Sequence, residues 1–170
     1  MRKTKRTTHH AKRITSQTSR SKMPEQKYPK IAVDVLIADG KKGILLIRRK
    51  TEPFNGRYAL PGGMVEYGET VEKAAVREVK EETGLDVELE GLLGVYSDPD
   101  RDPRGHVVSI VFFATPKKGK IAVSTDETED IGYKTLREIE NLELAFDHGI
   151  IVEDFKIIQM DEEEGKVKRK

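Results

Sequence analysis

GMVEYGETVEKAAVREVKEETGL, residues 63–85, is the stretch of sequence that says most about the fold. Apolar residues recur in it at every fourth position, at Val71, Ala75 and Val79. This spacing places them on one face of an α-helix. Gly84 follows the periodic residues, at the position where glycine commonly ends a helix. The pattern therefore predicts a helix over residues 70–83 that packs one face against a core.

The same stretch gathers three carboxylates on one side of the predicted helix. Glu78 and Glu82 lie one helical turn apart, with Glu81 beside them. Like charges at this spacing disfavour a helix by about 0.2–0.5 kcal/mol per pair, and a bound divalent cation would offset that repulsion. A donor set of oxygens alone suits Mg²⁺, or Mn²⁺, better than zinc. The alternative is that the glutamates form a solvated acidic face.

Residues upstream of the helix supply a second group of candidate site residues. Gly62 and Gly63 allow the backbone to approach a ligand closely, and an exposed carbonyl there is another hard oxygen ligand. Glu69 lies eight residues before Arg77 and can reach back to its guanidinium. We expect this ion pair to fix the loop against the helix.

The spacing of these residues reproduces a known motif, the Nudix box. Its matching positions are Gly63, Glu69, Arg77, Glu78, Glu81, Glu82 and Gly84. The sequence resembles the Nudix hydrolases from about Lys30 to Lys156, and residues 55–63 are similar to the family's entry to the box, with Tyr58 where tryptophan is common. The resemblance implies an α/β fold, the Nudix-type α/β/α sandwich with a mixed β-sheet.

The resemblance also implies a reaction, the hydrolysis of a diphosphate bond in a nucleoside diphosphate derivative. By position, the carboxylates of Glu78 and Glu82 and the carbonyl oxygen of Gly63 would bind the metal. Arg77 and Glu69 would orient the site rather than perform chemistry. No covalent intermediate is implied.

Two places in the sequence can supply the general base. Glu81 can act as a metal ligand or as the base, according to the resemblance. Other family members take the base from an acidic loop, which here corresponds to residues 126–130. Within that loop we choose Glu127 as the candidate base ahead of Glu129 or Asp130. The alternative is that the loop is only a solvated turn.

Substrate contacts are expected from two further segments. Arg48 and Arg49 end a predicted strand, and because successive side chains point to opposite faces, one of the two should reach phosphate. The loop over residues 96–106 is too long for a simple hairpin turn, and we expect it to contact substrate. The alternative is that it is a rigid structural loop. The expected substrate-binding residues are Arg48, Arg49, Arg57, Tyr96, Asp98, Arg101 and Arg104.

This loop and residues 144–148 resemble the ADP-ribose pyrophosphatase group of the family. The resemblance implies that ADP-ribose is cleaved to AMP and ribose 5-phosphate. Oxidised nucleoside triphosphates and capped RNA remain alternative substrates. A domain that senses ADP-ribose without hydrolysing it is an alternative of a different class. Relatives of this group also lead us to expect a homodimer.

Periodicity outside the box predicts the remaining elements. A hairpin over residues 31–47 turns at Asp39-Gly40. Strands are expected near residues 58–60, 89–97, 107–115 and 120–123, and a final helix over about residues 146–158.

Charge divides the chain into unlike parts. The whole sequence holds 31 basic and 30 acidic residues, but ten of the basic residues and one acid fall within residues 1–30. We therefore expect a basic, disordered arm over 1–28, a Nudix hydrolase domain over 29–160 and a charged tail over 161–170. Contact of the arm with nucleic acid is a hypothesis, and translation starting at Met23 is an alternative.

Composition excludes several classes of protein. The sequence has no cysteine, which excludes disulfide scaffolds, thiolate metal sites and cysteine nucleophiles. The longest apolar stretches, residues 31–38 and 107–114, are too short to span a bilayer. No apolar secretory segment follows the first methionine, so a cytoplasmic location is expected.

Overall fold

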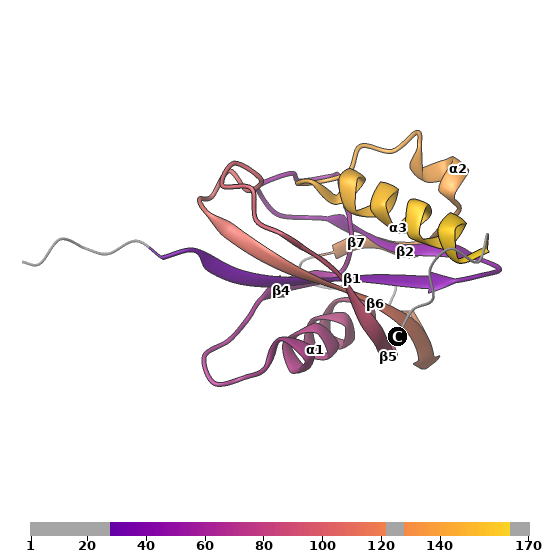
Figure 1. Ribbon diagram of the computed structural model, residues 1–170, viewed down its shortest axis with the longest axis horizontal. Helices are drawn as coiled ribbons and strands as arrows, with labels where there is room; N and C mark the ends of the chain where they lie inside the picture. Colours follow the sequence, from indigo (N-terminus) through magenta and orange to yellow (C-terminus); the bar gives the residue numbers. More distant parts are fainter. Residues whose placement is uncertain (1–27, 122–127, 164–170) are drawn as a thin grey trace, which may run out of the picture.

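The computed structural model describes residues 28–121 and 128–163. Within these ranges a seven-stranded sheet lies between helices on its two faces (Figure 1). The strands are β1 (Lys30–Asp39), β2 (Gly43–Arg49), β3 (Tyr58–Ala59), β4 (Gly62–Met64), β5 (Asp86–Tyr96), β6 (Val107–Lys118) and β7 (Thr128–Lys134). The helices are α1 (Val71–Thr83), α2 (Leu136–Ile139) and α3 (His148–Glu163).

Strand β1 organises the sheet, because it pairs with β2, β4 and β6. The strand order is β3-β2-β1-β6-β5, with β4 paired to β1 and β7 paired to β2. β1 and β6 run parallel, from Lys30 opposite Val107 to Ile37 opposite Ala114, and the other named pairs are antiparallel. The mixed sheet between helices confirms the expected α/β/α sandwich.

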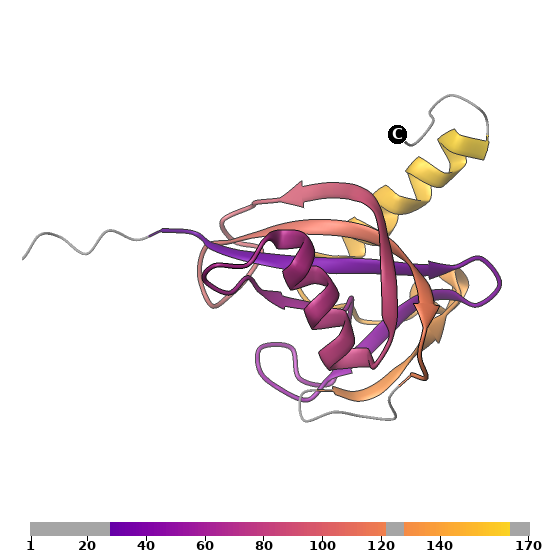
Figure 2. The same ribbon diagram turned by 90° about the horizontal axis from the view of Figure 1, so that it is seen from below.

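Alternate residues of β1 pack toward different helices, as the two-residue period of a strand requires. Val33, Val35 and Ile37 belong to the buried cluster that α1 closes. Leu36, between them, belongs to the cluster that contains Phe155 of α3. Seen from below, α1 crosses the sheet while α3 extends away from the body of the domain (Figure 2). The carboxylates of α1 and the first residue of α3 are thereby attached to opposite faces of one rigid sheet.

The hairpin and the helix predicted from local pattern are confirmed. β1 and β2 form the hairpin, with Asp39 opposite Gly43. α1 begins one residue later than expected, because Thr70 is its N-cap and its side chain accepts from the Lys73 backbone N–H. Gly84 ends the helix in the left-handed conformation with φ of 75°.

Other elements differ from expectation. Residues 119–121 form no strand, so the strand expected over 120–123 was wrong at its described residues, and 122–123 lie outside the described ranges. β7 and the short α2 were not predicted. α3 begins at His148 rather than Phe146, because Phe146 has a positive φ of 53° that no α-helix accommodates.

The two ends of the chain lie only partly within the described residues. The backbone of residues 161–163 continues α3. The basic arm over residues 1–27, and the remainder of the tail over 164–170, lie outside the described residues.

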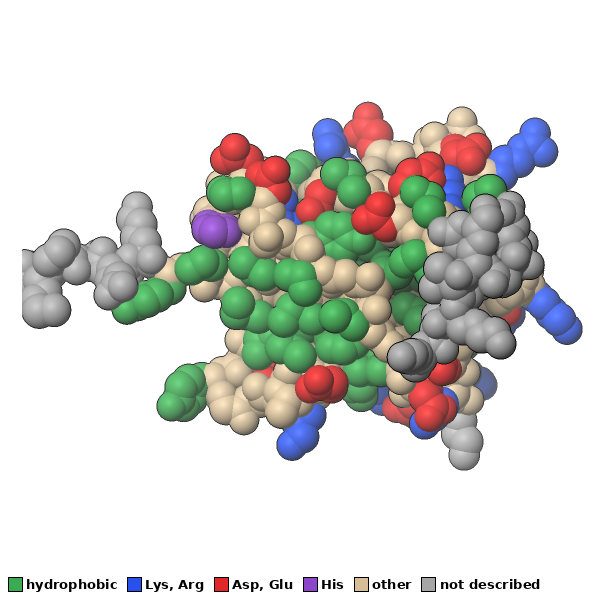
Figure 3. Space-filling model, in the orientation of Figure 1, with side chains coloured by type: hydrophobic (Ala, Val, Ile, Leu, Met, Phe, Trp, Pro, Cys, Tyr) green, Lys and Arg blue, Asp and Glu red, His purple; other side chains and the backbone are tan. Residues whose placement is uncertain are grey.

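The surface carries exposed apolar side chains where β5 forms the edge of the sheet (Figure 3). Leu92 and Val95 of β5 are exposed, as is Ile157 of α3. The homodimer stays a prediction.

Over the described ranges, no helix is both long enough and apolar enough to cross a membrane.

Candidate active site

A cavity of about 610 Å³ opens where α1, the central strands and two loops meet. Its size suits a ligand of nucleotide dimensions. It is lined by Ala32, Asp34, Arg49, Thr51, Ala59, Leu60, Gly62, Gly63, Met64, Glu78, Glu81, Glu82, Arg101, Asp102, Arg104, Val107, Phe146 and His148. The three helix carboxylates therefore share one cavity with arginines that are distant in sequence.

Arg77 ties α1 to the loop before it. Its Nε donates to Glu69 Oε2 at 3.2 Å and its second terminal nitrogen donates to Glu69 Oε1 at 2.7 Å, so the pairing expected from the sequence is present. The same guanidinium donates to the Met64 carbonyl oxygen at 3.2 Å. Hydrogen bonding from Arg77 holds the pKa of Glu69 below its ordinary value, and the bond to Glu69 raises the pKa of Arg77. Both groups are therefore charged at neutral pH, and their ion pair joins the loop to the helix.

Each of the three box carboxylates has a defined position. Glu78 accepts from Arg77 at 2.8 Å and lies against Gly63, where a Cβ would come within 2.5 Å of its carboxylate. Glu82 is buried and its Oε2 accepts from the Gly62 backbone N–H at 2.9 Å. The Glu81 side chain is 60% exposed, and Arg77 donates to its Oε2 at 3.3 Å. Glycine at 63 is thus what lets β4 approach Glu78, and glycine at 62 is what lets β4 approach β1.

The donor set fits a hard divalent cation, although the carboxylates do not form a closed cage. Within residues 28–121 and 128–163, no three His, Cys, Asp or Glu side chains already converge as a metal-binding group. Mg²⁺ usually takes one or two carboxylates and completes its octahedron with water and substrate phosphate. Two buried or partly buried carboxylates beside a glycine carbonyl meet that requirement.

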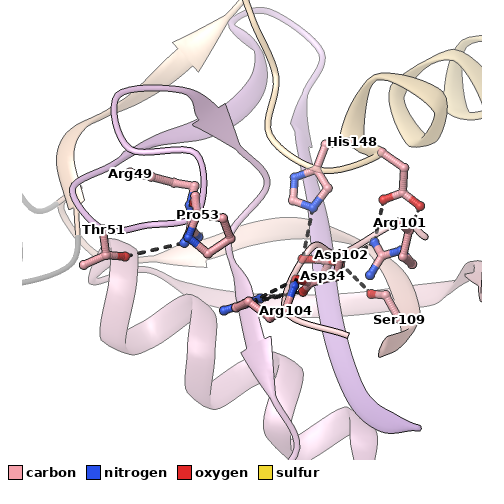
Figure 4. A network of polar contacts seen from close by, with 10 residues as sticks. Asp34, Arg49, Thr51, Pro53, Arg101, Asp102, Arg104, Ser109 and His148 are labelled. Atoms are coloured by element: carbon pink, nitrogen blue, oxygen red, sulfur yellow. Dashed lines mark hydrogen bonds and ion pairs between the residues drawn. The ribbon is translucent and has the colours of Figure 1, made fainter. Parts of the chain in front are cut away.

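Two arginines contact the aromatic ring of Phe146 in the cavity. The guanidinium carbon of Arg49 lies 5.1 Å from the ring centroid and that of Arg104 lies 5.3 Å from it. Arg49 Nε donates to the Pro53 carbonyl oxygen at 3.0 Å, which holds the side chain in place (Figure 4). Arg49, and not Arg48, is therefore the member of the pair that reaches the cavity.

Arg101 and Arg104 have different positions, although both were expected to bind substrate. Arg101 has a side chain only 3% exposed and forms a two-bond ion pair with Asp147. Arg104 is 44% exposed and forks onto the buried Asp102 two residues earlier, with bonds of 2.7–3.2 Å. Burial raises the pKa of Asp102, but the Arg104 hydrogen bonds outweigh it and lower that pKa overall. Arg101 anchors the loop before β6, and Arg104 is the cation that the loop presents.

Four residues expected to bind substrate lie outside the cavity. Arg48 forms an ion pair with Glu129 at 3.2 Å. Arg57 forms an ion pair with Glu143 at 3.4 Å, outside the cavity. The Tyr96 hydroxyl donates to Asp154 at 2.8 Å between β5 and α3. Asp98 accepts from a backbone N–H two residues on and stabilises its own turn. Each of these side chains has a partner away from the three carboxylates of α1.

The acidic segment proposed to supply a base is partly a strand. Glu127 lies outside the described residues. Glu129 and Asp130 belong to β7, where Glu129 pairs with Arg48 and Asp130 accepts from the Tyr58 hydroxyl at 3.0 Å. Neither lines the cavity, whereas Glu81 does.

Three buried polar residues were not named as site residues from the sequence: Asp34 and His148, which line the cavity, and Ser109, which bonds to Asp34. Asp34 is the one charged residue among the apolar positions 31–38 of β1, and that interruption was an available signal. Ser109 interrupts the apolar residues 107–114 in the same way, and His148 falls within residues 144–148, but the contacts of both with Asp34 join residues that are far apart in the sequence.

The sandwich topology, together with the Glu78 and Glu82 carboxylates beside the backbone of Gly62 and Gly63, defines a class of protein. The NUDIX domain model matches residues 28–155, and the chain belongs to the Nudix hydrolase family. An ADP-ribose pyrophosphatase from Methanocaldococcus jannaschii is 48% identical over 147 residues, which cover 86% of this chain and 84% of that relative.

Solved structures give the same fold. A bifunctional NMN adenylyltransferase/ADP ribose pyrophosphatase from Francisella tularensis, in complex with AMP and a manganese ion, is 28% identical with a TM-score of 0.66. The match covers 82% of this chain and 43% of that one. The NUDIX domain of Shewanella oneidensis NrtR, complexed with ADP ribose, has a TM-score of 0.69 at 24% identity, covering 79% of this chain and 90% of that one. At that identity the second likeness bears on the fold alone.

Proposed function

We propose that the protein hydrolyses ADP-ribose to AMP and ribose 5-phosphate with a divalent cation, Mg²⁺ in the first place and Mn²⁺ as a substitute. The observation that carries the proposal is the shared cavity, in which Glu78, Glu81 and Glu82 stand with Arg49 and Arg104. A diphosphate needs a cation where it is cleaved and further positive charge along its length. The names of the Methanocaldococcus and Francisella proteins support the choice of ADP-ribose.

Glu78, Glu82 and the Gly63 carbonyl oxygen are the residues that would hold the cation. When bound, it supplies positive charge to the diphosphate and to the attacking water. The buried position of Glu82 and the contact of Glu78 with Gly63 fix the directions from which the donors approach. Arg77 and Glu69 set the position of α1 against the loop rather than touching substrate.

Hydrolysis forms one phosphorus–oxygen bond to water and breaks the bridging one. The proton that water loses passes to a carboxylate, and Glu81 is our choice because it is the most exposed of the three and lines the cavity. The leaving phosphate departs as an anion. Arg49 and Arg104 are positioned to offset the charge of the substrate phosphates.

The proposal predicts a defined product pattern. With Mg²⁺ present, ADP-ribose should yield AMP and ribose 5-phosphate in equal amounts by chromatography, and EDTA should abolish the reaction. Oxidised and ordinary nucleoside triphosphates should react roughly tenfold or more slowly at equal concentration. Hydrolysis of triphosphates alone would contradict the choice of substrate. Binding of ADP-ribose without turnover would favour the sensing domain instead.

A second prediction separates the two adjacent arginines. Arg49→Gln should raise KM for ADP-ribose about tenfold, because a charge-assisted hydrogen bond is worth about 1.5–3 kcal/mol. Arg48→Gln is the matched control and should leave KM within about twofold, since an exposed ion pair contributes little. Steady-state rates of AMP release measure both. A larger effect from Arg48 than from Arg49 would contradict the placement of Arg49 in the binding site.

A further inference from the structure

A buried polar network in the wall of the cavity is not used by the proposed hydrolysis. Asp34 of β1 is only 8% exposed and accepts a hydrogen bond from the Ser109 hydroxyl (Figure 4). His148 Nε2 lies 3.5 Å from Asp34 Oδ1, and a terminal nitrogen of Arg101 lies 3.7 Å from Oδ2. Burial alone would raise the pKa of Asp34, but His148, Ser109 and Arg101 together lower it. The carboxylate is therefore retained as an anion inside the protein, which is costly unless its partners satisfy it.

His148 connects this anion to the segment that precedes β4. It is the first residue of α3 and is 2% exposed. Its Nδ1 accepts from the Leu60 backbone N–H at 2.9 Å. A nitrogen that accepts cannot carry a proton, so the neutral ring has its proton on Nε2, the nitrogen that faces Asp34. The ring thus bridges the Leu60 backbone and the Asp34 carboxylate.

The segment held by His148 leads directly to the carboxylates of α1. Gly62 is paired with Asp34 in the register of β1 and β4. Its backbone N–H donates to Glu82 at 2.9 Å, so the orientation of Glu82 depends on where Gly62 lies. The segment is therefore positioned from two sides, by His148 at Leu60 and by β1, which pairs with Gly62 and Gly63 and donates from the Val35 N–H to the Pro61 carbonyl oxygen at 2.8 Å.

We propose that His148 and Asp34 are a positioning pair that fixes residues 60–63, and through them the direction in which Glu82 and the Gly63 carbonyl face the divalent cation. This inference rests on the proposed function, since it assigns the cation to those groups. Neither His148 nor Asp34 touches the reacting atoms. Partners behind a metal ligand typically alter metal affinity or activity by about 10- to 100-fold when removed.

Three substitutions of His148 separate positioning from simple packing. His148→Asn places an amide oxygen close to the former Nδ1, where it can accept from Leu60. His148→Gln places its amide near the former Nε2 and loses that acceptor. His148→Leu has a size similar to asparagine and no polar atom. Binding of Mn²⁺ to the protein without substrate, followed by electron paramagnetic resonance, is measured beside kcat and KM for ADP-ribose.

We expect His148→Leu to weaken Mn²⁺ binding and to lower kcat by about tenfold or more each, with KM for ADP-ribose changed by less than about threefold. His148→Asn should restore both quantities to within about threefold of wild type, and His148→Gln should resemble leucine. Wild-type Mn²⁺ binding and kcat in folded His148→Leu would overturn the proposal. If the leucine variant does not fold, equal Mn²⁺ binding by the asparagine and glutamine variants overturns it.

Failure of the positioning pair is distinguishable from failure of the proposed function. A wild-type protein that leaves ADP-ribose intact would refute the proposed hydrolysis, while the Mn²⁺ series on the same variants would still support or refute the role of His148. Conversely, normal hydrolysis of ADP-ribose with unchanged Mn²⁺ binding in every variant would refute the pair alone.

Discussion

Glu82→Gln is expected to lower kcat for ADP-ribose by about a hundredfold to a thousandfold, the range found when a key electrostatic group is removed from an active site. The glutamine oxygen can still accept from the Gly62 N–H, so the hydrogen bond of 2.9 Å is preserved. What disappears is one negative charge from the oxygens assigned to the cation. The measurement is the initial rate of AMP release across a Mg²⁺ titration, with thermal unfolding recorded for each protein.

The matched control for this variant is Glu72→Gln on the same helix. Glu72 is an exposed acidic residue in the first turn of α1. Its replacement should leave kcat within about twofold, because surface substitutions away from a site are usually near neutral. A Glu82→Gln protein that is folded and turns over at the wild-type rate would refute the metal role of Glu82.

Alanine at the two adjacent glycines is expected to affect different properties: stability at Gly62 and kcat at Gly63. At Gly62 a Cβ would lie 2.2 Å from the Val33 carbonyl oxygen, which is backbone of the central strand and cannot yield. Gly62→Ala should therefore lose about 3 kcal/mol or more of unfolding free energy. At Gly63 the Cβ meets the Glu78 carboxylate at 2.5 Å, the end of a flexible side chain.

Gly63→Ala should consequently remain folded while its kcat falls about a hundredfold, because a displaced catalytic group is costly in rate. Urea unfolding and AMP release, measured on both variants, provide the comparison. A stable Gly62→Ala protein would show that β4 can move away from β1. Wild-type kcat in Gly63→Ala would show that the position of Glu78 does not matter to turnover.

Local signals explain what the sequence could predict. The helix and its end at Gly84 depend on residues within a few positions of one another. The ion pair of Glu69 with Arg77 spans only eight residues, and both ends fall in one motif. Interactions of this range leave a pattern that a reader of the sequence can count.

The positions of the residues that were expected to bind substrate depend on contacts that no local pattern records. The Arg101 side chain forms its ion pair with Asp147, which is 46 residues away. The Tyr96 hydroxyl donates to Asp154, which is 58 residues away. Until those partners are known, a buried anchor and an exposed ligand contact have the same appearance in the sequence. The bond from Leu60 to His148 spans 88 residues and was not predicted for the same reason.

Strand β7 was missed for a different reason. Its seven residues, Thr128–Lys134, include Ile131 and Tyr133 but also three charged side chains. A mostly polar strand is formed here because β2 offers a partner over six registered residue pairs. Its existence depends on that long neighbour rather than on its own β propensity.

The place where the chain enters the fold has a practical consequence for measuring ligand binding. The Lys30 N–H donates to the His106 carbonyl oxygen at 3.0 Å, and the next residue after His106, Val107, lines the cavity. A fusion partner or surface linker joined near residue 28 would be held beside the loop that presents Arg104. α3 starts at the cavity with His148, packs on the sheet through Ile151 and Phe155, and over its 16 residues carries its far end about 24 Å from His148 (Figure 2). Tethering the protein through the end of α3 will leave the cavity open to ligand.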